Sequence, residues 1–444
     1  MDKPGKILYH VKGLLVNILV QITNKFIRKI NILSGKASEA IHRFRWSPSP
    51  MADRLLADAL RLAEIPSPTH QEEQRTAFVL ERLGSLGIQP QMDEYGNILV
   101  KIPTQSPQDG APLLLFSDIG STRWHPLESL SRLDSVYARG AGLADILGCA
   151  ALLSAAESLT GGQLKCDRDV LLLFTAHALD DPEGKAFFPI TENHRYYPCA
   201  AIGLRGLSLG TVIAHTQGIY RIRINVSRER PEKDPGKEEA DSPAEASAGS
   251  TAETANQVVN SLIATARKLS SITWDSQGIT RFYIRRIEAG SGFDRTPGEG
   301  VLEIELESSD GAQLDMAMNT LKATAEHTPA AQGSLPGTKS PLQKGNPGEI
   351  KTEVTITSFI PVGEQNVNGE LLKTLRSIMK DLRIRCREEN GADPSAILSN
   401  RGIPSFSLGI AQGWEGLNSD TIDIASIERG RQLIEAIITR IHNE

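Results

Sequence analysis

Cysteine is scarce in this chain and never clustered. The 444 residues include four cysteines, which lie far apart and form no C-x-x-C pair. This spacing excludes a cysteine-built zinc ribbon and a disulfide scaffold. It favours a reducing compartment, so we expect a cytoplasmic protein. A chain of this length needs no such staple, because it can bury a large core in about two or three domains.

The chain also lacks an excess of positive charge and a long apolar run. Its formal net charge is −6, which argues against a nucleic-acid binder. The most apolar stretch near the N-terminus, residues 13–22, is about half as long as the roughly twenty residues that a membrane span requires. The charge is unevenly placed, with +7 on residues 1–50 and −13 on the remainder. Residues 1–50 are therefore predicted to be a basic N-terminal arm with its linker, attached to an acidic body.

Within this arm, residues 1–46 show helical spacing of apolar side chains with basic residues between them. The apolar positions recur every three or four residues and comprise Leu8, Val11, Leu15, Ile18, Ile22, Phe26 and Ile30. The pattern predicts an amphipathic helix. This helix could pack on its own chain or a protein partner, lie on an anionic membrane surface at the inner face, or span the bilayer. Residues 47–50 alternate Ser and Pro and read as a linker.

The body shows strands that alternate with helices. Residues 98–102, 112–116 and 169–175 read as buried strands, and residues 148–159 as a helix between them. The same alternation resumes from residue 353. This order predicts an α/β domain with a mixed sheet, made of residues 51–215 and 350–444.

The segment between these two parts has a different pattern. Residues 229–253 contain almost no large apolar side chain, so we expect a disordered insertion. Helical patterns near 254–269 and 311–327 flank two half-buried strands, and a Pro- and Gly-rich linker follows at 329–349. Residues 216–328 are therefore predicted to form a smaller α+β domain that interrupts the larger one.

Short motifs along the body resemble a known family in their order. They are Glu64-Ile65-Pro66-Ser67-Pro68, Asp93-Glu94-Tyr95-Gly96-Asn97, Gly140-Ala141-Gly142-Leu143-Ala144-Asp145, and Gly402-Ile403-Pro404 followed by Leu408-Gly409. Together they resemble the zinc-dependent exopeptidase family of tripeptidase T, acetylornithine deacetylase and succinyl-diaminopimelate desuccinylase. The resemblance implies a metallopeptidase-like domain interrupted by a lid domain that forms a homodimer.

The resemblance also implies two divalent metals, Zn, Mn or Co, and a glutamate that acts as general base. Most of the corresponding positions have changed in this chain. The family's positions for the His-x-Asp ligand pair, the bridging Asp, the ligand Glu, the next acidic ligand and the last His fall on Asp118, Gly120, Asp145, Leu179, Arg205 and Gly416. The general base falls on Ala178. Only Asp145 keeps the expected ligand type, so we expect no bound cofactor and a pseudoenzyme that binds a ligand or acts as a scaffold.

Two alternatives keep the chain active. In the first, a rearranged ligand set restores a metal-dependent exopeptidase or amidase, with Asp180, Asp181 or Glu183 replacing the glutamate pair and His125 or His177 as an imidazole ligand. In the second, Asp118 and Asp145 act as a metal-free carboxylate pair. If no metal binds, Arg205 is expected to neutralise these two carboxylates.

Overall fold

The computed structural model describes residues 49–67, 70–104, 110–121, 131–177, 181–192, 196–228, 256–290, 297–327, 350–416 and 418–441. Several predictions concern positions outside these ranges. They are the arm at 1–46, the insertion at 229–253, the linker at 329–349, and the site candidates His125, Ala178, Leu179 and Asp180. These predictions remain expectations from the sequence.

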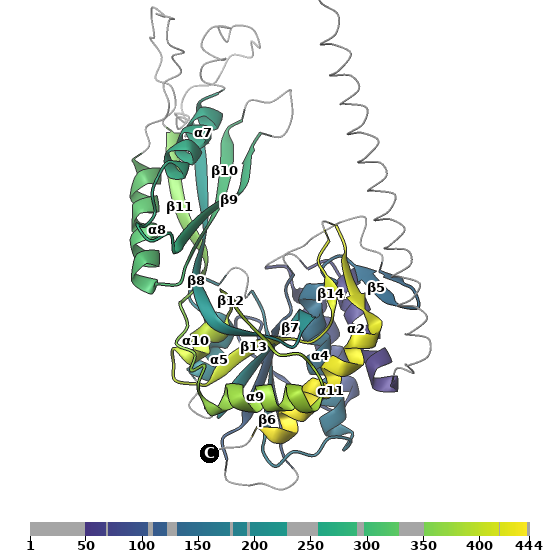
Figure 1. Ribbon diagram of the computed structural model, residues 1–444. Coiled ribbons are helices and arrows are strands. Elements are labelled where there is room, and N and C mark those ends of the chain that lie inside the picture. The colour runs from purple at the N-terminus through teal and green to yellow at the C-terminus, as the bar shows by residue number, and fades with distance from the viewer. Residues whose placement is uncertain are drawn as a thin grey trace, which may run out of the picture.

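The described chain forms a mixed α/β fold, as the sequence predicted (Figure 1). The helices of the larger part are α2 (Pro50–Glu64), α3 (Glu73–Ser85), α4 (Leu143–Thr160), the 3₁₀ turn η1 (Lys185–Phe187), α5 (Phe188–Thr191), α9 (Glu370–Asp381), α10 (Ser395–Ser399) and α11 (Ile424–Arg440). Its strands are β1 (Gln91–Met92), β2 (Ile98–Ile102), β3 (Leu113–Asp118), β4 (Arg132–Leu133), β5 (Tyr137–Gly140), β6 (Val170–Thr175), β7 (Ala200–Leu209), β12 (Arg387–Ala392), β13 (Ser405–Gly409), β14 (Gly413–Trp414) and β15 (Asp420–Asp423).

The large sheet is covered on both faces, because its central strands direct apolar side chains to both of them. In β3, Leu113 and Leu115 face the core formed with α2, α4, α9 and α11, whereas Leu114 and Phe116 face η1, α5 and α10. Strands β6, β3, β7 and β13 are mutually parallel neighbours in the order β6-β3-β7-β13. Buried parallel strands of this kind read as continuous apolar runs, which is why the sequence revealed them.

Helix α4 fits closely against β7, and two glycines permit this approach. A Cβ on Gly148 would lie 2.2 Å from the carbonyl oxygen of Leu204, and one on Gly206 would lie 1.8 Å from that of Ala144. Helix α4 is long and apolar enough to cross a membrane, but 83% of its apolar window is buried inside the protein. It is a core helix, and its N-terminal turn is held at the edge of the sheet.

Strand β8 (Thr211–Arg228) runs from the larger part into the smaller one. Its first half pairs with β12 and β13, and its second half pairs with β10 (Glu299–Ser308) and β11 (Ile350–Ile360). Strand β9 (Thr280–Ala289) extends this sheet beyond β10, and helices α7 (Gln257–Ser270) and α8 (Gly311–Glu326) pack on it to form a second core. Figure 1 shows β8 as the connection between the two bodies.

Strand β11 differs from its predicted assignment. The sequence placed residues from 350 onward in the larger domain, but β11 pairs with β8 from Arg228 to Ile219. Ile356 and Val354 also pack against the second core. Hydrogen bonding and burial therefore place residues 350–360 with the smaller body, and an alternating strand pattern alone could not indicate which sheet the strand would join.

Candidate functional site

Two of the predicted carboxylates lie together where the central strand β3 of the large sheet ends. Asp118 is the last residue of β3, and Asp145 lies in the first turn of α4. The backbone N–H of Gly120 donates to Asp118 Oδ1 at 3.0 Å, and the hydroxyl of Ser121 donates to Asp145 Oδ2 at 2.9 Å. The turn that follows β3 therefore orients both side chains.

These carboxylates line a cavity of about 460 Å³ that also reaches β8 and β11. Its charged lining residues are Asp118, Asp145, Arg205, Arg221, Glu389, Asp393 and Glu415. Phe187, Leu207 and Ile360 contribute apolar surface. The cavity is thus lined by acidic side chains together with two arginines and a few apolar side chains.

Sequence reasoning missed a third carboxylate, Glu72, which precedes α3 and is only 3% exposed. Its Oε1 lies 3.4 Å from the point where a Cβ on Gly120 would sit, and Asp118 Oδ1 lies 3.5 Å from the same point. The Glu72 carboxylate therefore lies beside the space that a side chain at position 120, where the resemblance places a ligand, would fill.

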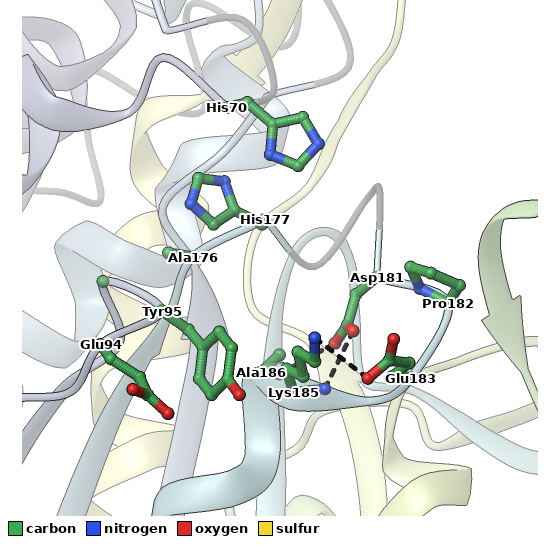
Figure 2. A pocket seen from close by; sticks show the side chains of 11 residues that line it. His70, Glu94, Tyr95, Ala176, His177, Asp181, Pro182, Glu183, Lys185 and Ala186 are labelled. Atoms are coloured by element: carbon green, nitrogen blue, oxygen red, sulfur yellow. Dashed lines mark hydrogen bonds and ion pairs between the residues drawn. The ribbon is translucent and has the colours of Figure 1, made fainter.

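Glu72 also contacts one of the candidate histidines. Its Oε2 lies 2.8 Å from His177 Nδ1. This is an ion-pair distance, although neither atom has a hydrogen-bond partner among the described residues. His177 and His70 both adopt left-handed backbone angles, with φ of 56° and 67°, and their ring centroids lie 4.7 Å apart. Figure 2 shows the two rings side by side above a second cavity of about 530 Å³.

The cation near these carboxylates is Arg75, not the predicted Arg205. Arg75 lies on α3, is 2% exposed, and donates from Nε to the carbonyl of Ile65 at 3.1 Å and from Nη1 to that of Ile119 at 3.0 Å. Burial lowers the pKa of Arg75, and the negative charges of nearby groups, among them Asp145, Asp118 and Glu72, act in the opposite direction. A buried guanidinium thus lies directly behind the turn that carries Asp118.

Arg205 occupies a different part of the cavity wall. Its Nη1 lies 3.7 Å from Oδ2 of Asp393, and about half of its side chain is exposed. Asp393 is itself buried and accepts hydrogen bonds from the hydroxyl of Ser407 and the backbone N–H of Ser395. The expected ion pair from Arg205 to Asp118 and Asp145 is therefore wrong, because a buried carboxylate on a more distant part of the chain holds this arginine.

The environment of Asp118 raises the pKa of its carboxyl group to about 7. Burial is the main cause, and the negative charges of Glu72 and Asp145 add to it. The Gly120 N–H and Arg75 favour the ionised form, but they do not outweigh burial. Asp118 therefore exchanges its proton near neutral pH.

The remaining predicted ligand positions have structural roles or no donor side chain. Asp181 accepts hydrogen bonds from the backbone N–H groups of Lys185 and Ala186, and Glu183 pairs with Lys185. Figure 2 shows this loop on the side of the second cavity away from the histidines. At Gly416 a Cβ would lie 2.3 Å from the carbonyl oxygen of Ser419, so the backbone there leaves no room for a histidine.

The fold is shared with solved structures of peptidases. A tripeptidase from Staphylococcus aureus is similar over 87% of this chain and 97% of its own, with a TM-score of 0.59 and 19% identity. A Bacillus subtilis protein, described as a dinuclear metal-binding peptidase from the M20 family, is similar over 87% and 97%, with a TM-score of 0.52 and 15% identity. Human carnosine dipeptidase 1 is similar over 88% and 96%, with a TM-score of 0.61 and 9% identity. No protein-family model matches the chain, and no curated protein matches it.

A dinuclear metal centre does not fit the described residues. They contain no group of three or more His, Cys, Asp or Glu side chains arranged to hold a metal ion. Gly120 and Gly416 lack donor side chains, and Arg205 would repel a cation. The likeness to these peptidases therefore shows their fold in the described residues.

Proposed function

We propose that this chain is a non-catalytic, ligand-binding relative of the M20 peptidases, in which a buried arginine takes the place of the metal ions. The observation that carries the proposal is Arg75, which is almost fully buried, donates to the carbonyls of Ile65 and Ile119, and lies within electrostatic range of Asp145, Asp118 and Glu72. A buried positive charge is stable only where negative groups or hydrogen-bond acceptors surround it, and these carboxylates provide that environment.

The same charge opposes metal binding. A divalent ion held by Asp118 and Asp145 would face the guanidinium across a poorly solvated site, where Coulomb repulsion is screened weakly. Loss of donors at Gly120 and Gly416 removes the coordination that could outweigh this repulsion. The cavity beside Asp118 remains, and a binding or scaffolding role needs only the cavity.

The proposal also includes a homodimer and a location in the cytoplasm. The smaller body has an edge strand in β9, and we infer that it mediates a homodimer, as the family resemblance implies. We infer a cytoplasmic location, with the basic arm binding a partner or the inner membrane surface. Light scattering that gives a 48.2 kDa monomer at micromolar concentration would contradict the dimer.

Metal analysis combined with peptidase assays tests the function. Full-length protein should contain no near-stoichiometric Zn, Mn or Co after growth and dialysis with each metal, and it should not cleave dipeptides, tripeptides or N-acyl amino acids. Asp145→Ala is the matched variant, because Asp145 is the one retained ligand type. Near-stoichiometric metal together with turnover that is lost in Asp145→Ala would replace the proposal with a metal-dependent exopeptidase or amidase.

A second candidate function is metal-independent hydrolysis, and the Glu72–His177 pair is the observation that favours it. A carboxylate next to an imidazole is a common general-base arrangement, and His177 directly precedes the position where the family resemblance places the base. Cleavage of a dipeptide, tripeptide or N-acyl amino acid that persists in EDTA and disappears in His177→Gln would establish this function. The same turnover lost only on metal removal would exclude it.

A further inference from the structure

The chain passes between the two bodies at two places within the described residues, and these two crossings lie in direct contact. Strand β8 makes the first crossing, and residues 361–369 make the second one after β11. The backbone N–H of Gly363 on the second crossing donates to the carbonyl of Thr216 on the first at 3.1 Å. A Cβ on Gly363 would lie 2.8 Å from Cβ of Thr216, and one on Gly218 would lie 2.9 Å from Cγ2 of Val362. Neither glycine could therefore carry a side chain unless the two crossings separated.

The side chain of Gln365, on the second crossing, joins the first crossing to the larger body. Its Oε1 accepts the backbone N–H of Thr216 at 3.2 Å, and its Nε2 donates to the hydroxyl groups of Thr216 and, at 3.3 Å, of Ser395. Ser395 is the first residue of α10, and both Thr216 and Ser395 are buried. Hydrogen bonds in such a setting are shielded from competing water, so this amide ties β8 to α10.

A second amide side chain holds the other crossing. Asn400 directly follows α10 and caps its C-terminal end. Its Nδ2 donates to the carbonyl of Val362 at 2.8 Å, and its Oδ1 accepts the backbone N–H of Glu364 at 2.9 Å. These two bonds lie on either side of Gly363, the residue that contacts β8. Both crossings are thus bound to α10, one at the start of the helix and one at its end.

Apolar side chains also pack where the smaller body meets α10. Ile219 of β8 and Ile360 of β11 form a buried cluster with Ala396 of α10. Figure 1 shows α10 in the part of the larger body that lies below the smaller one. A segment that opens easily has few buried apolar contacts and many exposed hydrogen bonds. This junction has buried apolar contacts and partly buried hydrogen bonds, so we expect it to be stiff.

The orientation of the smaller body matters for the cavity beside Asp118, because both bodies line that cavity. Arg221 and Ile360 belong to the smaller body, whereas Asp118 and Arg205 belong to the larger one. A rotation at the crossings would move the first pair relative to the second. The shape of this cavity therefore depends on the angle that the junction maintains.

We propose that the side chains of Gln365 and Asn400 form a latch on α10, which holds the smaller body in one orientation and keeps this cavity formed without a ligand. The two glycines set the separation of the crossings, and the latch restrains the angle between the bodies. A preformed cavity lowers the cost of ordering that a ligand would otherwise meet on binding. The inference goes beyond the proposed function, because it concerns the orientation of the two bodies and is independent of the ligand.

Distance measurements between two spin labels on the full-length protein, by pulsed electron paramagnetic resonance, test this proposal. Ser85→Cys at the end of α3 and Ser271→Cys after α7 place one label on each body, at exposed positions. The three partly exposed cysteines are changed to serine in this background; they are Cys166, Cys199 and Cys386. Without any ligand, we expect a single narrow distribution of distances. Two separated distances in this parent protein would overturn the proposal, because the smaller body would then occupy more than one orientation.

Removal of the latch should release the smaller body. Gln365→Ala combined with Asn400→Ala should widen the distribution of distances about two-fold or more, because both crossings lose their side-chain bonds to α10. Gln365→Glu keeps an acceptor for the Thr216 N–H but lacks the N–H donors, so it should widen the distribution to a smaller extent. Asn368→Ala, at an exposed position on the second crossing, is the control and should match the parent protein. An unchanged distribution in the double variant would refute the latch. If the double variant does not fold, an unchanged distribution in Gln365→Glu refutes it instead.

These measurements are separate from those that test the proposed function. Stoichiometric metal with metal-dependent turnover would overturn the proposed function and leave the latch in place. Several orientations of the smaller body, in a protein without metal or turnover, would overturn the latch alone.

Discussion

Removing the charge of Asp118 should stabilise the protein, and more so as the pH rises. The folded-state pKa of this carboxyl group is about 7, whereas its ordinary value is 3.8. The folded protein therefore keeps this proton to a higher pH than the unfolded chain does. Stability is lost as the pH rises from about 4 through 7, because the unfolded chain ionises freely and the folded protein does not. Asp118→Asn abolishes this loss.

The size of the effect follows from the difference in pKa. Each pKa unit corresponds to about 1.4 kcal/mol, so the full difference of about three units sets an upper limit near 4 kcal/mol. Part of the Asp118 side chain faces the cavity, where water can solvate the charge, so we expect roughly half of this limit. Between pH 5 and pH 8 only about two units of this difference apply, roughly 2.7 kcal/mol, and half of that gives Asp118→Asn a gain of about 1.4 kcal/mol relative to the wild type.

Urea unfolding of both proteins at pH 5, 6, 7 and 8, followed by tryptophan fluorescence, measures this difference. The Asn side chain can still accept the hydrogen bond from the Gly120 N–H, so a local geometric loss should be small. Asp53→Asn, at an exposed position in the first turn of α2, is the control and should show no such pH dependence. A difference that is flat from pH 5 to pH 8, or a variant that becomes less stable as the pH rises, would refute this account of Asp118.

Three further outcomes test other parts of the structure. Arg75→Met should lower the free energy of unfolding by about 3–5 kcal/mol at pH 7, because it removes the cation nearest the buried carboxylates. A loss below about 1 kcal/mol would show that these carboxylates do not depend on Arg75. Cys149 is fully buried, and burial raises the pKa of its thiol, so it should resist iodoacetamide at pH 8 in the native protein and react only after unfolding; rapid native alkylation read by mass spectrometry would contradict this. Deletion of residues 2–46 should leave a folded body and abolish co-sedimentation with anionic vesicles, and equal sedimentation of both proteins would refute the membrane role of the arm.

Much of the fold could be predicted because burial leaves a direct trace in the sequence. Strands β3 and β6 begin with continuous apolar runs, Leu113–Phe116 and Val170–Phe174, and such runs are typical of parallel strands that are buried on both faces. The predicted strand at 112–116 ended two residues before Asp118, and the predicted helix at 148–159 began three residues after Asp145, so both carboxylates were assigned to the site through the family resemblance. The α/β class is confirmed for this reason.

The tertiary structure alone decided how the charges at the site are balanced. Glu72 directly precedes α3 and Arg75 lies in its first turn, and nothing in this part of the sequence indicates that the helix packs against the end of β3 some forty residues later. The same limitation led to the wrong partner for Arg205, which binds Asp393 nearly two hundred residues away. Periodicity reports which face of an element is buried, but it does not report which distant element covers that face. A buried charge is neutralised by whichever group packing brings within a few ångströms, and that depends on the three-dimensional fold.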